Sequence, residues 1–353
     1  MEKIIRKILN YPREKASKKE RSELIANVVA LSLSLLSKKG YEFPDDCAKV
    51  VFAKISDSAD SEYNFLEKHI MIDKLFFTQD DALYNDLPLL AHEVCHLAQD
   101  YDPHKKTSIP NMVYVDPVEV ENLIAALGVF YDEESEIASL DDLQNLANYI
   151  YSYYYLQDYE FKAYQFMIEV FNFVINTAKN MELSPYEKQT LDIMTSNNVM
   201  HPMANNLMKH KRLRQSKKVA QKSQELINRF LTDWFKDHPN ALDSFKLKKE
   251  DQLVTNMLCW MVPALMVGYN DEIAHKYFNA LAKSKLKYVE QDLVFLVQKT
   301  KIQLTPDEVK LLLPFIEKFN KEYDSTLTYD IILSEKARFL QDNARIAGED
   351  PIM

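Results

Sequence analysis

Apolar positions along the chain follow two periods, and the change between them predicts an α+β fold that is predominantly α-helical. Near the N-terminus they recur at helical spacing from Leu24 to Leu35, after a capping box at Ser17–Glu20 and before Gly40. Three short apolar runs then predict strands at Lys49–Ile55, Tyr63–Leu66 and His69–Asp73. We therefore expect a first helix that packs on a small sheet.

A second helical pattern covers residues 86–101. Asp86 is placed to cap its start, and Pro88 falls in the first turn, where the missing N–H does no harm. Its apolar stripe consists of Leu90, Val94 and Leu97. Pro103 predicts the end of this helix, because the residue before a proline disfavours helical geometry.

From about residue 117 onward nearly every segment has a helical pattern. A capping box at Thr305–Glu308, with Pro306 at the first helical position, predicts a helix that continues to about Tyr323. The chain has only four glycines, which agrees with a large helical region because sheet-rich folds use glycine in turns.

Two segments have biased composition. The aromatic stretch Tyr149–Tyr155 is typical of packing between helices, and the alternative interpretation is a wall of a substrate cleft. The basic run over residues 209–218 is typical of a solvated helix face, with an acidic partner or nucleic acid as the alternative. A net charge of −10 argues against nucleic acid as a partner.

The chemistry is concentrated in residues 92–96, which read His-Glu-Val-Cys-His. Residues four apart share a helix face, so His92 and His96 can both bind one Zn²⁺. Glu93 lies beside that metal and can act as a general base toward water. Cys95 is turned away from the two imidazoles and is interpreted as a small buried apolar residue.

A small sheet followed by such a helix resembles the zincin metallopeptidases of the gluzincin type, from about residue 45 to about residue 165. The resemblance implies a zincin-like catalytic unit over residues 1–135, which carries the sheet and the metal-binding helix. A helical extension over residues 136–200 would complete the catalytic domain, and residues 201–353 would form a C-terminal helical domain.

A catalytic zinc needs a third protein ligand, and in gluzincins it is a glutamate on a later helix. Glu119 is favoured, because Asp116–Glu121 is similar to the Asp-Pro-x-Glu-x-Glu form of such families. Glu160 is the alternative: a small residue, Ala163, follows it by three positions, but its longer distance from His96 requires a helical insertion. Glu121 is the weakest candidate, since it points away from Glu119 on a helix.

These residues predict a zinc-dependent metallopeptidase that cleaves a peptide bond of a protein or peptide substrate, with Glu93 as the general base. The donor that stabilises the oxyanion is left open among Tyr114, His104 and Tyr159. The alternative function is a catalytically inactive zincin-like protein that serves as an interaction scaffold.

The cellular setting follows from cysteine usage and from the N-terminus. Three widely spaced cysteines imply no disulfide framework and favour a reducing compartment. The first ten residues lack a signal-peptide pattern, and no apolar run is long enough to span a bilayer. We expect a cytoplasmic protein, with export by a signal-independent route left open.

Overall fold

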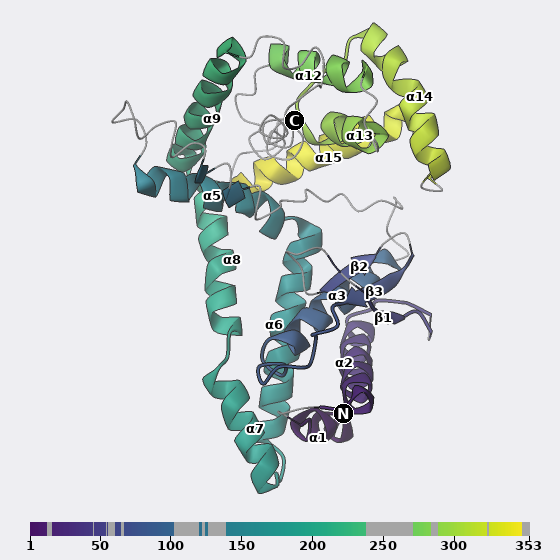
Figure 1. Ribbon diagram of the computed structural model, residues 1–353, viewed down its shortest axis with the longest axis vertical. Helices are drawn as coiled ribbons and strands as arrows, with labels where there is room; N and C mark the ends of the chain where they lie inside the picture. The colour runs from purple at the N-terminus through teal and green to yellow at the C-terminus, as the bar shows by residue number, and fades with distance from the viewer. Residues whose placement is uncertain are drawn as a thin grey trace. The chain divides into compact units, whose positions relative to one another are not determined.

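The computed structural model describes residues 1–12, 16–44, 46–53, 55, 61–64, 67–101, 120–121, 124–125, 139–237, 271–283, 289–322 and 325–347 (Figure 1). The chain divides into two compact units. Unit 1 comprises Met1–Pro110 and Asp158–Leu207, and unit 2 comprises Asn111–Gln157 and Met208–Met353. The predicted class is confirmed: the described fold is mainly helical, with one small sheet.

The helices of unit 1 surround one apolar core. They are α1 (Glu2–Leu9), α2 (Lys18–Lys38), α3 (Asp86–Asp100), α6 (Asp158–Lys179) and α7 (Pro185–Ser196), and α8 (Met200–Gln215) begins in this unit. The predicted capping box starts α2: the Ser17 hydroxyl accepts from the Glu20 N–H, and the Glu20 carboxylate accepts from the Ser17 N–H. Gly40 follows the helix with a φ of 89°, a left-handed conformation that glycine adopts at little cost.

The sheet of unit 1 has the strand order β1-β3-β2. Its strands are β1 (Val50–Phe52), β2 (Ser61–Asn64) and β3 (His69–Ile72). The central strand β3 is parallel to β1 and antiparallel to β2, with Ser61 opposite Ile72. All three predicted strands are confirmed. However, β2 begins at Ser61 rather than at Tyr63, so the Ser61 hydroxyl lies at the start of this strand.

Helix α3 is the central helix of unit 1, and it packs between α2 and α6 (Figure 1). Its residues from Leu90 to Gln99 are buried on every side, so the predicted apolar stripe is part of a fully covered helix. The predicted cap was wrong: Asn85 is the N-cap and makes no side-chain cap bond. Asp86 instead accepts a hydrogen bond of 2.6 Å from the Phe77 N–H, so it holds the preceding loop against the helix start.

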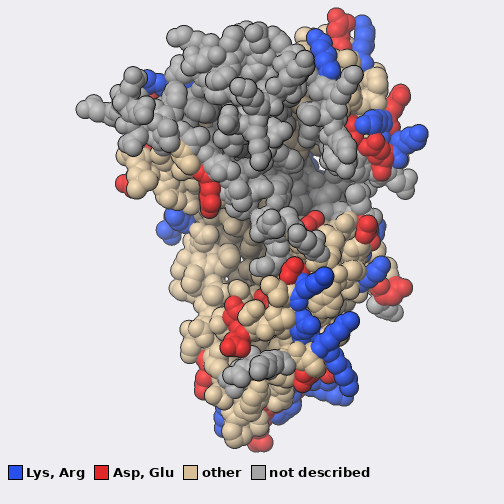
Figure 2. Space-filling model, viewed as in Figure 1, with Lys and Arg blue, Asp and Glu red and all other residues tan. Residues whose placement is uncertain are grey.

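The outer surface of unit 1 is polar where α2 meets solvent. The exposed side of this helix carries Lys18, Lys19 and Lys38, and Figure 2 shows basic side chains gathered over it. The opposite side buries Leu24, Val28, Leu31 and Leu35 in the same core as α3. This division between faces is the one that the helical spacing of apolar residues predicts.

All of the secondary-structure elements in the described part of unit 2 are helices. They are α5 (Leu140–Tyr155), α9 (Lys217–Asp237), α12 (Asp271–Lys283), α13 (Val289–Lys299), α14 (Pro306–Glu322) and α15 (Tyr329–Ala347), together with the end of α8. The capping box predicted at Thr305 starts α14, since the Glu308 N–H donates to the Thr305 hydroxyl and the Glu308 carboxylate accepts from the Thr305 N–H. Helix α13 packs on both α14 and α15.

The basic run at the end of α8 is only partly solvated. Lys209, Lys211 and Arg212 are exposed as predicted, but His210 and Arg214 are buried. The Arg214 guanidinium lies 3.1 Å from the ring centroid of Tyr153, and the His210 ring stacks on Tyr155. The aromatic stretch of α5 therefore packs against this run, and the buried His210 and Arg214 are part of the core of unit 2.

None of the described helices combines the length and the hydropathy that a bilayer span requires.

Candidate metal centre

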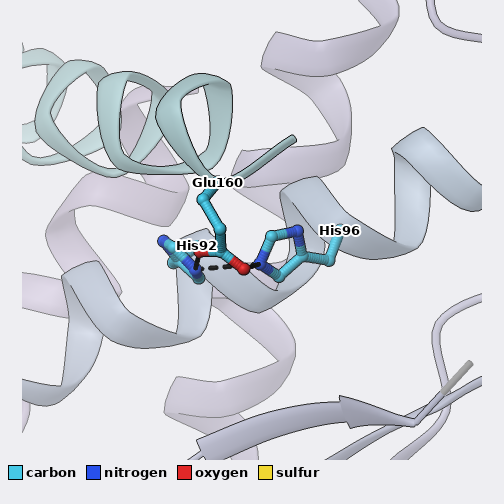
Figure 3. Close-up of side chains that lie close together, drawn as sticks. All are labelled: His92, His96 and Glu160. Atoms are coloured by element: carbon cyan, nitrogen blue, oxygen red, sulfur yellow. Dashed lines mark hydrogen bonds and ion pairs between the residues drawn. The ribbon is translucent and has the colours of Figure 1, made fainter. Parts of the chain in front are cut away.

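Two helices of unit 1 carry the residues of the site. His92 and His96 are one turn apart on α3, so their imidazoles project from the same face. Glu160 lies in the first turn of α6, the helix that makes the most extensive packing contact with α3. Because α6 begins at Asp158, its first turn brings the Glu160 carboxylate directly over the two imidazoles (Figure 3).

The three side chains converge on one point. Glu160 Oε2 is 3.2 Å from His92 Nε2, and Glu160 Oε1 is 3.3 Å from His96 Nε2. The two Nε2 atoms are 2.9 Å apart, and one ligand atom from each of the three residues lies within 4.8 Å of the others. The exposed fractions are 6% for His92, 4% for His96 and 1% for Glu160, so the group is almost completely removed from solvent.

Hydrogen bonding within the protein leaves this group incompletely satisfied. Glu160 Oε2 is buried and makes no hydrogen bond to any described residue, although His92 Nε2 is close. His92 Nδ1 is likewise buried without a partner among the described residues. Buried polar atoms are rarely left in this state, and a cation among the three ligand atoms would compensate the carboxylate oxygen. Two imidazoles and a carboxylate form a known donor set for zinc, so these residues could hold a metal ion.

The electrostatics of the group are set by burial and by mutual charge. Burial alone would raise the pKa of Glu160, but the neighbouring imidazoles, His96 foremost, hold that pKa well below its usual range. For His96, burial lowers the pKa, and the Glu160 charge outweighs it so that the net shift is upward. The carboxylate is therefore ionised at neutral pH, which is the form that binds a cation.

Two tyrosines of α6 pack on the imidazoles. The Tyr159 ring is stacked on His96 with an interplanar angle of 1° and a centroid distance of 4.1 Å. The Tyr164 ring meets His92 edge-on at 4.5 Å. These contacts fix the planes of both imidazoles, and the ring of Tyr159 excludes water from one face of His96.

Glu93 lies next to His92 in the sequence of α3 and is buried. The Ser61 hydroxyl at the start of β2 donates a hydrogen bond of 3.1 Å to Glu93 Oε1. The Glu93 charge also contributes to the raised pKa of His96. On Glu62, burial is the main cause of a raised pKa, and the charge of Glu93 adds to it.

The structure brings together His92, His96 and Glu160, the alternative third ligand of the sequence prediction. Glu119, the favoured candidate, lies outside the described residues. Glu121 is exposed and is not part of the group. With Glu160 as the third ligand, a helical insertion is expected between His96 and Glu160. Helix α5 lies between α3 and α6 along the chain, belongs to unit 2 and corresponds to this insertion.

The other candidates near the motif have separate outcomes. The Tyr159 hydroxyl donates to the backbone oxygen of His96 at 3.3 Å, so it is engaged away from the ligand atoms. Tyr114 and His104 lie outside the described residues. Cys95 is buried, as interpreted, and burial raises the pKa of its thiol to about 12, which keeps it protonated.

Besides Tyr164, which packs on His92, two residues that contact the site were absent from the sequence prediction. Gln99 and Ser61 contact His96 and Glu93, respectively. The position of Gln99, three residues after His96 on the same helix, is a signal that could have identified it. Ser61 reaches the site only through sheet pairing, which no local pattern indicates.

Comparison of the chain with protein-family models, with curated proteins and with solved structures gives no match.

Proposed function

We propose that the protein is a zinc-dependent metallopeptidase. The observation that carries the proposal is the convergence of His92 Nε2, His96 Nε2 and the Glu160 carboxylate in a buried space, beside a further carboxylate, Glu93, on the same helix. A purely structural set of ionic contacts does not account for this adjacent buried carboxylate, which forms no ion pair with a cation among the described residues. A hydrolytic site needs such a group as its base.

In this proposal His92, His96 and Glu160 are the three protein ligands of the zinc. The bound ion supplies Lewis acidity, which polarises the scissile carbonyl and lowers the pKa of a coordinated water to about 7. The burial of the three residues strengthens every electrostatic interaction among them, since little water is present to screen it.

Glu93 is the proposed general base. Its carboxylate takes a proton from the attacking water and gives it to the leaving amine, so the group returns to its ionised form at the end of the cycle. The hydrogen bond from Ser61 to Glu93 Oε1 holds the carboxylate in one orientation. The Tyr159 hydroxyl is not assigned to the oxyanion, because it is bound to the His96 backbone oxygen.

The first part of the test is metal binding by the full-length protein. Metal-free protein is titrated with zinc, and bound metal is measured after removal of the free ion. We expect about one zinc per chain, and no tight site after His96→Ala. The matched control is His201→Ala, which removes an exposed histidine of α8 and should bind zinc like the wild type. Equal binding by His96→Ala and the wild type would refute the site.

The second part of the test is hydrolysis. The zinc-loaded protein is incubated with a library of peptides, and new termini are detected by mass spectrometry. Glu93→Gln should keep its zinc and lose at least about 100-fold in rate, the usual contribution of a general base. Undiminished cleavage by Glu93→Gln would exclude Glu93 as the base. Zinc binding without cleavage of any peptide would instead favour the interaction scaffold.

A further inference from the structure

Gln99 occupies a position on α3 from which it contacts both helices of the proposed zinc site. It lies three residues after His96 and is buried. His96 Nδ1 is 2.9 Å from Gln99 Oε1, and Gln99 Nε2 donates a hydrogen bond of 2.9 Å to the backbone oxygen of Tyr159. The side chain therefore joins one metal ligand to the residue that immediately precedes another, Glu160.

These two contacts determine the protonation of His96. A backbone oxygen can only accept a hydrogen bond, so the amide nitrogen of Gln99 must face Tyr159. The amide oxygen then faces His96, and because it too can only accept, His96 Nδ1 must carry a proton. In the neutral imidazole the lone pair is then on Nε2, the atom that lies 3.3 Å from Glu160 Oε1.

The same side chain positions the start of α6. Tyr159 is held in three ways: its backbone oxygen by Gln99, its hydroxyl by the His96 backbone oxygen, and its ring by stacking on His96. Glu160 is the next residue, so the contacts that hold Tyr159 also position Glu160 and its carboxylate. A carboxylate at position 99 could accept from His96, but it could not donate to Tyr159. A side-chain amide does both.

We infer that Gln99 is a positioning residue of the zinc site, which selects the Nδ1–H form of His96 and fixes Glu160 relative to it. The inference rests on the proposed zinc function. Residues that accept a hydrogen bond from a ligating imidazole raise metal affinity by about 10- to 100-fold, because they fix the tautomer and the ring orientation. Gln99 acts through His96 and Glu160 and does not touch the metal itself.

The test measures the zinc affinity of the full-length protein by competition with a chromophoric chelator. Gln99→Met has a similar volume and no acceptor, and it should bind zinc about 10- to 100-fold more weakly than the wild type. Gln99→Glu keeps an oxygen acceptor for His96, and its zinc affinity should stay within about tenfold of the wild-type value. The matched control is Gln165→Met, the same change at an exposed position of α6, with an expected affinity equal to that of the wild type.

A second measurement needs no variant. In zinc-loaded wild-type protein, the ¹⁵N resonances of the His96 ring should show a protonated Nδ1 and a metal-bound Nε2. A metal-bound Nδ1 would overturn the inference. So would wild-type affinity in Gln99→Met, or equal losses in Gln99→Met and Gln99→Glu, since equal losses would indicate packing rather than the acceptor.

The outcomes separate this inference from the function on which it rests. If the wild type binds no zinc, the proposed function fails. If the wild type binds zinc and all three variants bind it equally well, the inference on Gln99 fails and the zinc site remains. Circular dichroism of the metal-free variants tests whether each is folded, and a loss of affinity in a folded variant is attributed to the site.

Discussion

Each compact unit contains a buried glutamate in contact with histidine, Glu160 in unit 1 and Glu308 in unit 2, and these two carboxylates differ in what else they bind. In unit 2, His275 Nδ1 lies 2.9 Å from both oxygens of Glu308. The same carboxylate also accepts from the Thr305 N–H, the Thr305 hydroxyl and the Asn279 side chain at 2.7–3.0 Å. In unit 1, Glu160 faces two imidazoles, and its Oε2 has no hydrogen bond within the described residues.

The difference shows how to distinguish a structural carboxylate from one that is available to a metal. Glu308 is satisfied by four donor groups, which link α12 to the start of α14, and a cation would have to displace them. Glu160 is more deeply buried and has fewer donors, which is costly in the absence of a counter-ion. A close histidine–glutamate pair is thus ambiguous by itself, and the remaining contacts of the carboxylate decide its role.

The largest expected effect compares the same substitution in both units. Glu160→Gln removes a charged ligand and should weaken zinc binding by more than about 100-fold, or more than about 2.7 kcal/mol. Glu308→Gln should leave zinc affinity unchanged, because that carboxylate belongs to a helix cap. Isothermal titration of both metal-free variants measures the difference. Comparable zinc losses in the two variants would remove the distinction between the units.

Zinc should stabilise one unit and not the other. At a free concentration about a thousand times its Kd, a ligand that binds only the folded state adds about 4 kcal/mol to the free energy of unfolding. Hydrogen exchange measured by mass spectrometry should show slower exchange in peptides from α3 and α6 when zinc is added. Peptides from α12 and α14 serve as the internal control and should exchange at unchanged rates. Equal protection of both sets would indicate a site other than the one described.

The smallest expected effect concerns Glu308 and pH. Burial would raise the pKa of Glu308, but the hydrogen bonds from the Thr305 N–H and His275 outweigh it and hold the pKa below its ordinary value. Its contribution to stability is therefore complete above the unfolded-state pKa of about 4.3, and it is lost as the pH falls toward the lowered value. At pH 7, Glu308→Gln should cost about 2 kcal/mol, typical of hydrogen bonds to a charged group.

Urea unfolding of metal-free protein at several pH values measures this effect. The stability difference between the wild type and Glu308→Gln should shrink between pH 6 and pH 3. Glu317→Gln, at an exposed position of the same helix, is the control and should differ little from the wild type at any pH. A difference that stays constant with pH would mean that the charge of Glu308 does not contribute.

Local patterns predicted the elements well where the responsible interactions are also local. The capping boxes at Ser17 and Thr305 and the helix that carries His92 and His96 all depend on residues within one or two turns of each other. The prediction failed where a side chain binds a group outside its own helix. Asp86 binds Phe77 instead of capping its own helix, and Arg214 is covered by Tyr153 although its neighbours along the chain are solvated.

By itself, the amino-acid sequence determined that the chain is mainly helical, and it placed two imidazoles and a carboxylate within one turn of a helix, because a period of 3.6 residues is a property of the local backbone. The tertiary structure decided which described glutamate faces them. Glu160 reaches His92 and His96 because α6 packs on α3 through apolar residues of the shared core. Such packing depends on residues far apart in the chain, and no spacing rule contains it.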